Sequence, residues 1–394
     1  PNLDIAAILK KHENPLVAQL TAALEGNPDL VRIAWRWFPR ALLVDVNIGH
    51  LNLAEALLDM EGGGPLTTQA ILEQIELPTD VNLKLTEFSL NLALQEDGRF
   101  DEVGPAGKIL WFLRRLEPQG VQNTPLYLHW NPIEYDPDQI REMLSVFEGQ
   151  VSDELETTST PASGNHTNAC TISLIYPHWR AGTLPLSDNI CSHFPTAYES
   201  QRVLFTFIDG QSGKRFPGWV VLSERYVYGL EEWFAQKGII PGSLIEIQEG
   251  ENPGEVILNA GGRRTTRDWM RTALVGADGS MVFALLKQLM TTLTNERMTI
   301  FIPDREALDR VWEAGTFQRK SLEKVVISMM RELAKLSPQG HVHAQELYAA
   351  VNVVRRCPPG PILSLLLNRP WAKHLGDLYF RLDEPSPEQG EYNE

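Results

Sequence analysis

Four arginines close together in the chain are the residues best suited to bind an anion. They follow the pair Gly261-Gly262 and are Arg263, Arg264, Arg267 and Arg271. If this segment is helical, Arg263, Arg267 and Arg271 share one face. Guanidinium groups in such a row can follow a line of phosphates, so we expect a contact with nucleic acid here. The alternative is a solvated helix face whose arginines pair with Asp268 and nearby acids.

A second basic candidate lies near the C-terminus. Arg355 and Arg356 stand just before Pro358-Pro359 and offer two adjacent guanidinium groups. Adjacent cations of this kind can contact the phosphate backbone. We therefore include both as candidate contacts with nucleic acid.

No stretch of the sequence matches a catalytic or cofactor-binding motif. The glycine triplet at residues 62–64 lacks the Gly-Lys-Ser/Thr of a phosphate-binding loop, and no Gly-x-Ser-x-Gly elbow or dinucleotide fingerprint occurs. The spacing of His341, His343 and Glu346 is similar to that of metal ligands, but the sequence nearby offers no further ligand. The cysteines lie far apart and form no CxxC pair. We expect no enzyme activity, no metal and no cofactor.

The formal net charge of -16 argues against the prediction that this protein binds phosphates, because phosphate binding depends on Lys and Arg. The acidic residues are concentrated in the N-terminal part of the chain, because residues 1–150 hold 22 acidic and 11 basic side chains. Residues 276–382 hold 14 basic and 10 acidic ones. We therefore expect the acidic N-terminal half to contact a protein partner and the C-terminal part to contact DNA.

The elements that would position these groups include a set of strands in the middle of the chain. Apolar and polar residues alternate there with a period of two, most clearly in residues 203–208, 219–222, 244–247 and 256–258. Residues 230–237 have helical spacing and are followed by Gly238, which ends the helix. This order predicts a small mixed β barrel that holds one or two helices.

The order of short signatures in this segment resembles the B-three DNA-binding pseudobarrel of plants. The signatures lie at residues 182–187, 191–195, 202–210, 226–234 and 238–247. In that family, a short strand and a helix that ends near Phe-Pro lead into a hairpin, then a Gly-Trp helix and a Gly-Asp turn. This sequence has Gly229-Leu230 in place of the Gly-Trp pair.

In B-three domains, two arms between strands enter the major groove. Carried onto this sequence, the resemblance implies DNA contacts from Trp179, Arg180, Lys214, Arg215, Arg225 and Tyr226. The two arm arginines would reach a guanine edge or a phosphate, the two aromatic side chains would pack on sugar or base, and the hairpin pair 214–215 would contact the backbone. Glu224 adds a negative charge to the second arm. A barrel that serves as a protein-binding module is the alternative.

Two flanking stretches share one expected order of elements, three helices followed by a two-stranded hairpin. They are residues 48–116 and 318–383, with Phe100 and Trp371 near the expected start of each wing. Both resemble the winged helix-turn-helix of the delta subunit of bacterial RNA polymerase and of added modules in some restriction and chromatin proteins. The first copy is acidic, like that subunit, which implies contact with a polymerase or another protein.

We therefore expect an α+β multidomain protein with two winged helix-turn-helix domains that flank a small mixed β pseudobarrel. Residues 151–169 contain no apolar period and should form a flexible linker, and residues 385–394 a disordered tail. The other expected parts are N-terminal helices in 1–47, an acidic winged helix in 48–117, a helical extension in 118–150, the pseudobarrel in 170–262, a helical connector in 263–317 and a second winged helix in 318–384.

The sequence predicts a non-enzymatic DNA-binding protein with a role in transcription or defence. No run of about 18 apolar residues occurs, and residues 1–11 lack a basic start followed by an apolar block, so we expect no membrane contact and a cytoplasmic location. Two alternatives stay open: a scaffold, associated with a polymerase or chromosome, that binds only proteins, and an accessory subunit of a nuclease. The oligomeric state does not follow from the sequence.

Overall fold

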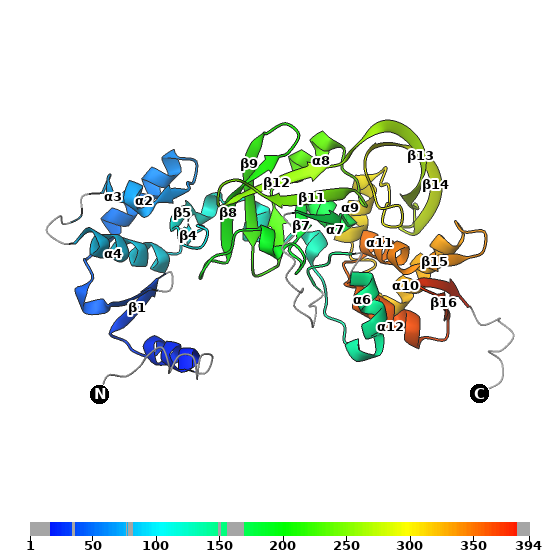
Figure 1. The fold of residues 1–394 in the computed structure, drawn as a ribbon, viewed down its shortest axis with the longest axis horizontal. Helices are drawn as coiled ribbons and strands as arrows, with labels where there is room; N and C mark the ends of the chain where they lie inside the picture. The colour runs from blue at the N-terminus through cyan, green and yellow to red at the C-terminus, as the bar shows by residue number, and fades with distance from the viewer. Residues whose placement is uncertain are drawn as a thin grey trace. The chain divides into compact units, whose positions relative to one another are not determined.

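The computed structural model describes residues 16–33, 36–75, 77, 82–148, 151–155 and 169–383, except for the side chain of Arg263. The chain divides into two compact units, residues 1–122 with 196–204 and residues 123–195 with 205–394. The fold is mixed α+β with several separate sheets, which confirms the predicted class at that level (Figure 1). Within the described ranges, no helix is both long and apolar enough to cross a membrane.

The first unit starts with a helix over residues 16–25 and a hairpin of β1 (Leu30–Ile33) and β2 (Arg36–Pro39). This hairpin corrects the helical prediction for the later part of residues 1–47. Val31 and Ile33 are buried and alternate with less buried residues along β1. β-Branched side chains in such an alternation favour a strand over a helix.

The rest of the first unit combines helices with a small sheet. After η1 (Arg40–Leu42) come α2 (Ile48–Met60), β3 (Leu66–Thr67), α3 (Thr68–Leu72), α4 (Leu83–Glu96), β4 (Phe100–Glu102), β5 (Leu110–Leu113), η2 (Arg114–Leu116) and α5 (Gln119–Gln122). The sheet has the order β3-β5-β4. Leu58, Leu90 and Trp111 lie in one apolar core. The indole NH of Trp111 donates to Asn91 Oδ1 over 2.9 Å, so its only polar atom is satisfied inside that core.

The second unit begins with η3 (Leu126–Leu128), η4 (Pro137–Ile140) and α6 (Arg141–Glu148). The segment that follows corrects part of the predicted linker in 151–169, because Val151 to Glu154 are buried. Asp153 and Glu154 form ion pairs with the buried Arg356, which fixes these four residues in the interior. Residues 156–168 of the predicted linker lie outside the described part.

A seven-stranded sheet occupies the middle of this unit. Its strands are β6 (Ala169–Ser173), β7 (Thr183–Pro185), β8 (Arg202–Asp209), β9 (Arg215–Val221), β10 (Tyr226–Tyr228), β11 (Leu244–Glu249) and β12 (Glu255–Ala260). The order is β6-β11-β12-β8-β9-β10-β7, with β12 parallel to β8 and β11 antiparallel to both of its neighbours. The sheet curls into a half-barrel, accompanied by α7 (Tyr176–Ala181), η5 (Cys191–His193) and α8 (Glu231–Lys237) (Figure 1).

A separate two-stranded ribbon of β13 (Gly262–Val275) and β14 (Met281–Thr292) follows the half-barrel. It corrects the helical connector predicted in 263–317, where the only α-helix is α9 (Arg305–Glu313). The ribbon curls strongly (Figure 1). β14 is buried at residues 281 and 283 and at 290 and 292, and it is exposed between them at residues 285–287 and 289. On β13 the exposed residues lie in the first half of the strand, up to Trp269. The ribbon therefore has one accessible stretch formed by the first half of β13 and the middle of β14.

The C-terminal part repeats the order of elements found in the first unit. It consists of α10 (Leu322–Ala334), β15 (His341–His343), α11 (Ala344–Val354), α12 (Pro359–Asn368), β16 (Ala372–Gly376) and β17 (Tyr379–Leu382). Its sheet has the order β15-β17-β16, so helix, strand, helix, helix, strand and strand recur with the same strand order in 48–113 and 322–382. Met330, Val351, Leu366 and Phe380 are buried in its core.

Candidate nucleic-acid interface

The first predicted arm is built into the interior of the second unit. Trp179 on α7 is buried, and its indole NH donates to the Ile239 carbonyl over 2.7 Å. Arg180 donates to Asp309 through Nε at 2.9 Å and Nη2 at 2.7 Å. Burial opposes the charge of Asp309, but the hydrogen bonds from Arg180 and Tyr127 lower its pKa below the usual value. Both predicted contacts of this arm are therefore engaged within the fold.

The second predicted arm is engaged in a similar way. Tyr226 begins β10 and is only 1% exposed. Arg225 has a φ of 54° in the preceding turn and pairs with Asp188 over 2.5 Å. A buried ring offers no face to a base. The arm residues thus hold the half-barrel together, and the surface available to a ligand lies elsewhere.

The predicted hairpin cations remain on the surface. Lys214 directly precedes β9 and Arg215 begins it, and both are exposed. Arg215 pairs with Glu255 over 2.6 Å. The Arg215 side chain is 59% exposed, so water weakens this pair and the guanidinium can turn toward an anion.

The predicted pair near the C-terminus is buried. Arg355 donates to the Lys320 carbonyl over 2.7 Å. Arg356 is fully covered and donates to both oxygens of Asp153, at 2.9 and 2.7 Å, and it pairs with Glu154 at 2.9 Å. Neither guanidinium is placed to contact a phosphate. The bonds of Arg356 tie the segment after α6 to the end of α11.

Some arginines of the cluster are exposed, whereas Arg271 is held by contacts within the fold. Arg264 and Arg267 are exposed on β13, and the side chain of Arg263 lies outside the described part. Arg271 is held in place, since it pairs with Glu346 over 2.5 Å and donates to the Thr299 carbonyl. The arginines that were predicted to share a helix face thus lie on a strand. A spacing of four residues still places two side chains on the same side, because strand side chains alternate with a period of two and a helix turns once in 3.6 residues.

One face of the ribbon combines cations with apolar side chains. Three pairs of directly opposed residues lie on this face, which we call the ribbon face: Arg267 with Leu289, Trp269 with Lys287, and Arg271 with Leu285. Each pair contains one cation and one apolar group, and none of the six is acidic. The Lys287 ammonium lies 5.3 Å from the centre of the Trp269 ring. The Trp269 and Leu289 side chains are 61% and 56% exposed, so both can meet a ligand.

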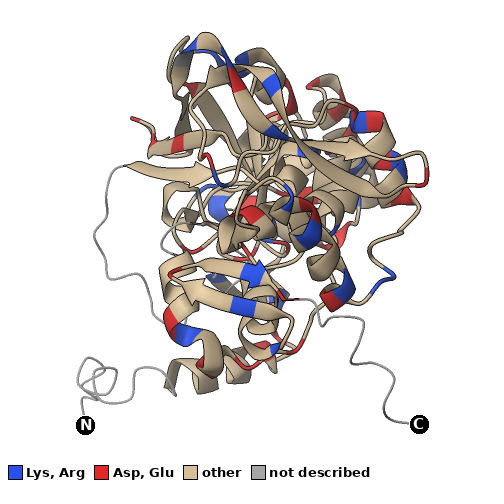
Figure 2. Cartoon of the chain, turned by 90° about the vertical axis from the view of Figure 1, so that its right-hand side faces the viewer, with Lys and Arg blue, Asp and Glu red and all other residues tan. Residues whose placement is uncertain are grey.

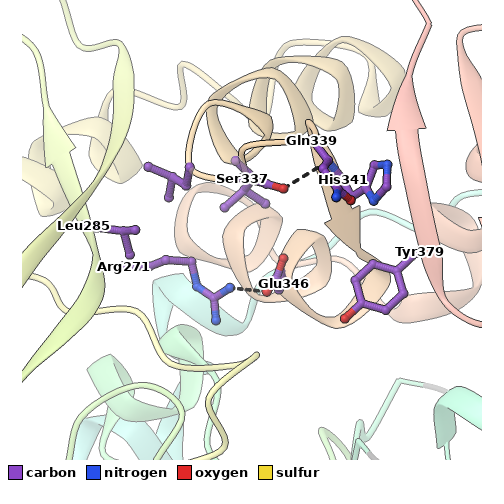
Figure 3. A pocket seen from close by; sticks show the side chains of 9 residues that line it. Arg271, Leu285, Ser337, Gln339, His341, Glu346 and Tyr379 are labelled. Carbon is purple, nitrogen blue, oxygen red and sulfur yellow. Dashed lines mark hydrogen bonds and ion pairs between the residues drawn. The ribbon is translucent and has the colours of Figure 1, made fainter.

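The ribbon face ends at a pocket of about 400 Å³ (Figure 3). Arg271 and Leu285 reach into it from the ribbon, Glu346 from α11 and Tyr379 from β17. The remaining lining residues come from α10 and the turn after it and from β15: Leu333, Leu336, Ser337, Gln339 and His341. A volume of this size lies within the range of ligand pockets in proteins.

A buried histidine supports the pocket from behind. His343 caps α11, its Nδ1 accepting from the Gln345 backbone NH at 3.2 Å. Its Nε2 lies 2.9 Å from Nη1 of Arg297. Burial, with the charges of Arg297 and Arg271, lowers the pKa of His343 to about 4. The ring therefore stays neutral at physiological pH, and its two nitrogens lie against the first turn of α11 and against Arg297.

Several residues of this interface were missed from the sequence. Lys287, Trp269 and Tyr379 carry no local motif, and their proximity depends on the pairing of β13 with β14 and on the C-terminal sheet. The one available signal was an aromatic residue, Trp269, two positions from both Arg267 and Arg271. In Figure 2, Lys and Arg positions are interspersed with Asp and Glu positions along most elements.

Comparison with known proteins gave no match to any family model, curated protein or solved structure. The part of the chain that the structure describes also contains no group of three or more His, Cys, Asp or Glu residues suited to a metal ion. The function must therefore be argued from the site itself.

Proposed function

We propose that this protein binds nucleic acid through the ribbon face and that its acidic front unit contacts a protein partner. The observation that carries the proposal is the exposed two-stranded ribbon on which cations alternate with apolar side chains. Two-stranded ribbons can enter the major groove of DNA. Exposed aromatic groups between cations also suit single strands, since bases stack on the rings while phosphates meet the cations.

The arrangement of the other elements supports the proposal. We interpret the repeated order of elements in residues 48–113 and 322–382 as two winged helices, and the half-barrel with α7 and α8 as a B-three-like pseudobarrel. Folds of these kinds are frequent in transcription and defence proteins that bind DNA. A fold does not determine a function, so the ribbon face carries the argument.

The proposal is tested by measuring the affinity of the full chain for labelled duplex and single-stranded oligonucleotides at several salt concentrations. Replacing Arg267 and Lys287 with Ala should weaken binding and lower the slope of log K against log salt by about 0.7–0.9 for each phosphate contact removed. Trp269→Ala should weaken binding about tenfold, in line with one lost stacking contact of roughly 1–3 kcal/mol.

The matched control is Lys84→Ala, which removes an exposed cation from α4 in the first unit. It should leave both the affinity and the salt slope unchanged. If the full chain binds neither duplex nor single strands at low salt, the proposal is wrong. A salt slope that Lys84→Ala lowers as much as the ribbon variants would also refute it, because binding would then follow total charge.

A protein-binding scaffold is the second candidate, and the surface of α2 favours it. Leu53 and Met60 are 51% and 83% exposed on this helix. Exposed apolar residues on an acidic unit suit a protein partner. Co-purification of a partner that survives nuclease and high salt, together with no oligonucleotide binding by the full chain, would establish the scaffold instead.

A further inference from the structure

We infer that the pocket at the end of the ribbon face holds one unpaired nucleobase of a strand lying on that face. This inference rests on the proposed function and adds the part of the ligand that is recognised. Arg271 and Leu285 belong to both surfaces, since they are opposed across the ribbon and also line the pocket (Figure 3). A strand that follows the ribbon face from Arg267 past Trp269 therefore arrives at the pocket.

The walls of the pocket match the two kinds of surface that a base presents. A base has two apolar faces and a polar edge. Leu285, Leu333 and Leu336 supply an apolar wall, and Tyr379 supplies an aromatic ring. The pocket volume of about 400 Å³ accommodates a flat ring system together with its sugar.

The polar groups of the pocket can form hydrogen bonds with the edge of a base. Gln339 is exposed at the rim, and its amide offers one acceptor and two donors. Ser337 Oγ accepts from the His341 backbone NH over 3.3 Å, which leaves its hydroxyl hydrogen to donate to a ligand. Paired donors and acceptors of this kind distinguish one base from another.

The charged groups of the pocket are fixed before any ligand arrives. Arg271 donates to the carbonyls of Glu296, Arg297 and Thr299 and pairs with Glu346. Its guanidinium therefore has a set position beside the entering strand, and its charge is shared with Glu346. The second carboxylate oxygen of Glu346 accepts from the His343 backbone NH, so this acid is neutralised and bonded on both oxygens.

The aromatic wall is fixed in the same way. The Tyr379 ring meets the edge of His343 with 4.9 Å between ring centres, and the Arg297 guanidinium lies 5.6 Å from its centre. A ring positioned in advance loses little conformational freedom when a base stacks on it. Tyr379 is still 37% exposed, so a face remains open to the pocket.

The test uses the full chain and a short oligothymidylate with 2-aminopurine at a single position, whose fluorescence reports unstacking from its neighbours. Scanning the position of the 2-aminopurine should give a large change at one position of the bound strand and small changes elsewhere. Tyr379→Ala should remove that change and weaken binding about tenfold, in line with one lost stacking contact. Tyr379→Phe should retain both.

Leu336→Trp fills the pocket without removing a hydrogen bond, and it keeps the test valid if Tyr379→Ala fails to fold. It should abolish the position-specific signal and leave the salt slope of the ribbon face unchanged. Salt-dependent binding that responds to Arg267→Ala and Lys287→Ala but not to Tyr379→Ala or Leu336→Trp would overturn this inference alone. Free adenosine monophosphate that binds as tightly as the oligonucleotide would also overturn it. No oligonucleotide binding at all would overturn the proposed function with it.

Discussion

Replacing Arg356 with Ala should destabilise the second unit strongly and should not act through nucleic acid. Arg356 is buried with Asp153, Glu154 and Tyr348. Tyr348 donates its hydroxyl to Asp153, and His178 lies 2.9 Å from Glu154. Burial alone would raise the pKa of Glu154, but the charges of Arg356 and His178 lower it, so Glu154 is ionised beside the guanidinium.

The magnitude follows from what remains after the substitution. Removing the arginine leaves two buried carboxylates without their main counter-charge, and the loss of one partner from a buried ion pair costs about 3–5 kcal/mol. In a unit of this size, each kcal/mol lowers the melting temperature by about 2–4 °C. We therefore expect a decrease of about 10 °C, measured by calorimetry on the full chain at neutral pH.

Arg369→Ala is the matched control. Arg369 lies in the same C-terminal part, its side chain is 51% exposed, and its ion pair with Glu323 spans 3.5 Å. Such surface pairs contribute less than about 1 kcal/mol, so this variant should melt close to the wild type. An Arg356→Ala protein that melts like the control but loses oligonucleotide affinity would refute the structural role and favour a phosphate contact.

Two further predictions concern pH. The pKa of His343 falls from 6.5 to about 4 on folding, so between these pH values only the unfolded chain gains a proton. The free energy of unfolding of the wild type should therefore fall by about 1.4 kcal/mol for each pH unit as the pH decreases through this window. His343→Asn keeps a capping side chain and should lack this contribution. Burial and the neighbouring Asp101 raise the pKa of Glu117 from 4.5 to about 8, so only the unfolded chain loses a proton as the pH rises through that window. Glu117→Gln should therefore stabilise the first unit increasingly from about pH 4.5 to 8.

Denaturant unfolding of the full chain between pH 4 and 8 measures both effects, with Glu61→Gln, at an exposed carboxylate, as the control. Parallel stability curves for the wild type and His343→Asn would show that the ring does not resist protonation in the native state. A Glu117→Gln protein that is less stable at every pH would show that the ion pair with Arg202, at 3.4 Å, outweighs burial.

The strands of the half-barrel are the part of the fold that the sequence predicts best, and the reason is local. Every second residue of β8, starting at Val203, is buried, and this period of two is produced only by a strand. The ribbon lacks that signal because Leu285, Leu286 and Leu289 are all exposed apolar residues. The spacing of its arginines fits a helix as well as a strand, so the pattern does not identify either one.

The candidate interface was harder to predict, because exposure depends on partners distant in the chain. Arg355 and Arg356 are adjacent cations in the sequence, yet both are buried, and Arg356 pairs with Asp153, which is about 200 residues away in the chain. Trp179 and Tyr226 were expected at a ligand and are instead core residues of the half-barrel. In each case the side chain has the right chemistry for a contact, and the packing of the unit decides what it contacts.

The net charge of -16 is compatible with a nucleic-acid partner because electrostatic attraction acts locally. At physiological salt the Debye length is about 8 Å, so a bound phosphate responds mainly to the charges within a few residues of it. On the ribbon face those charges are Arg267 and Lys287, together with Arg271, whose charge is balanced by its ion pair with Glu346. Asp268 adjoins Arg267 in the chain and lies on the other side of β13, because successive strand residues alternate in direction. The affinity should therefore follow mainly Arg267 and Lys287, and the total charge of the chain should affect mainly which other molecules approach it.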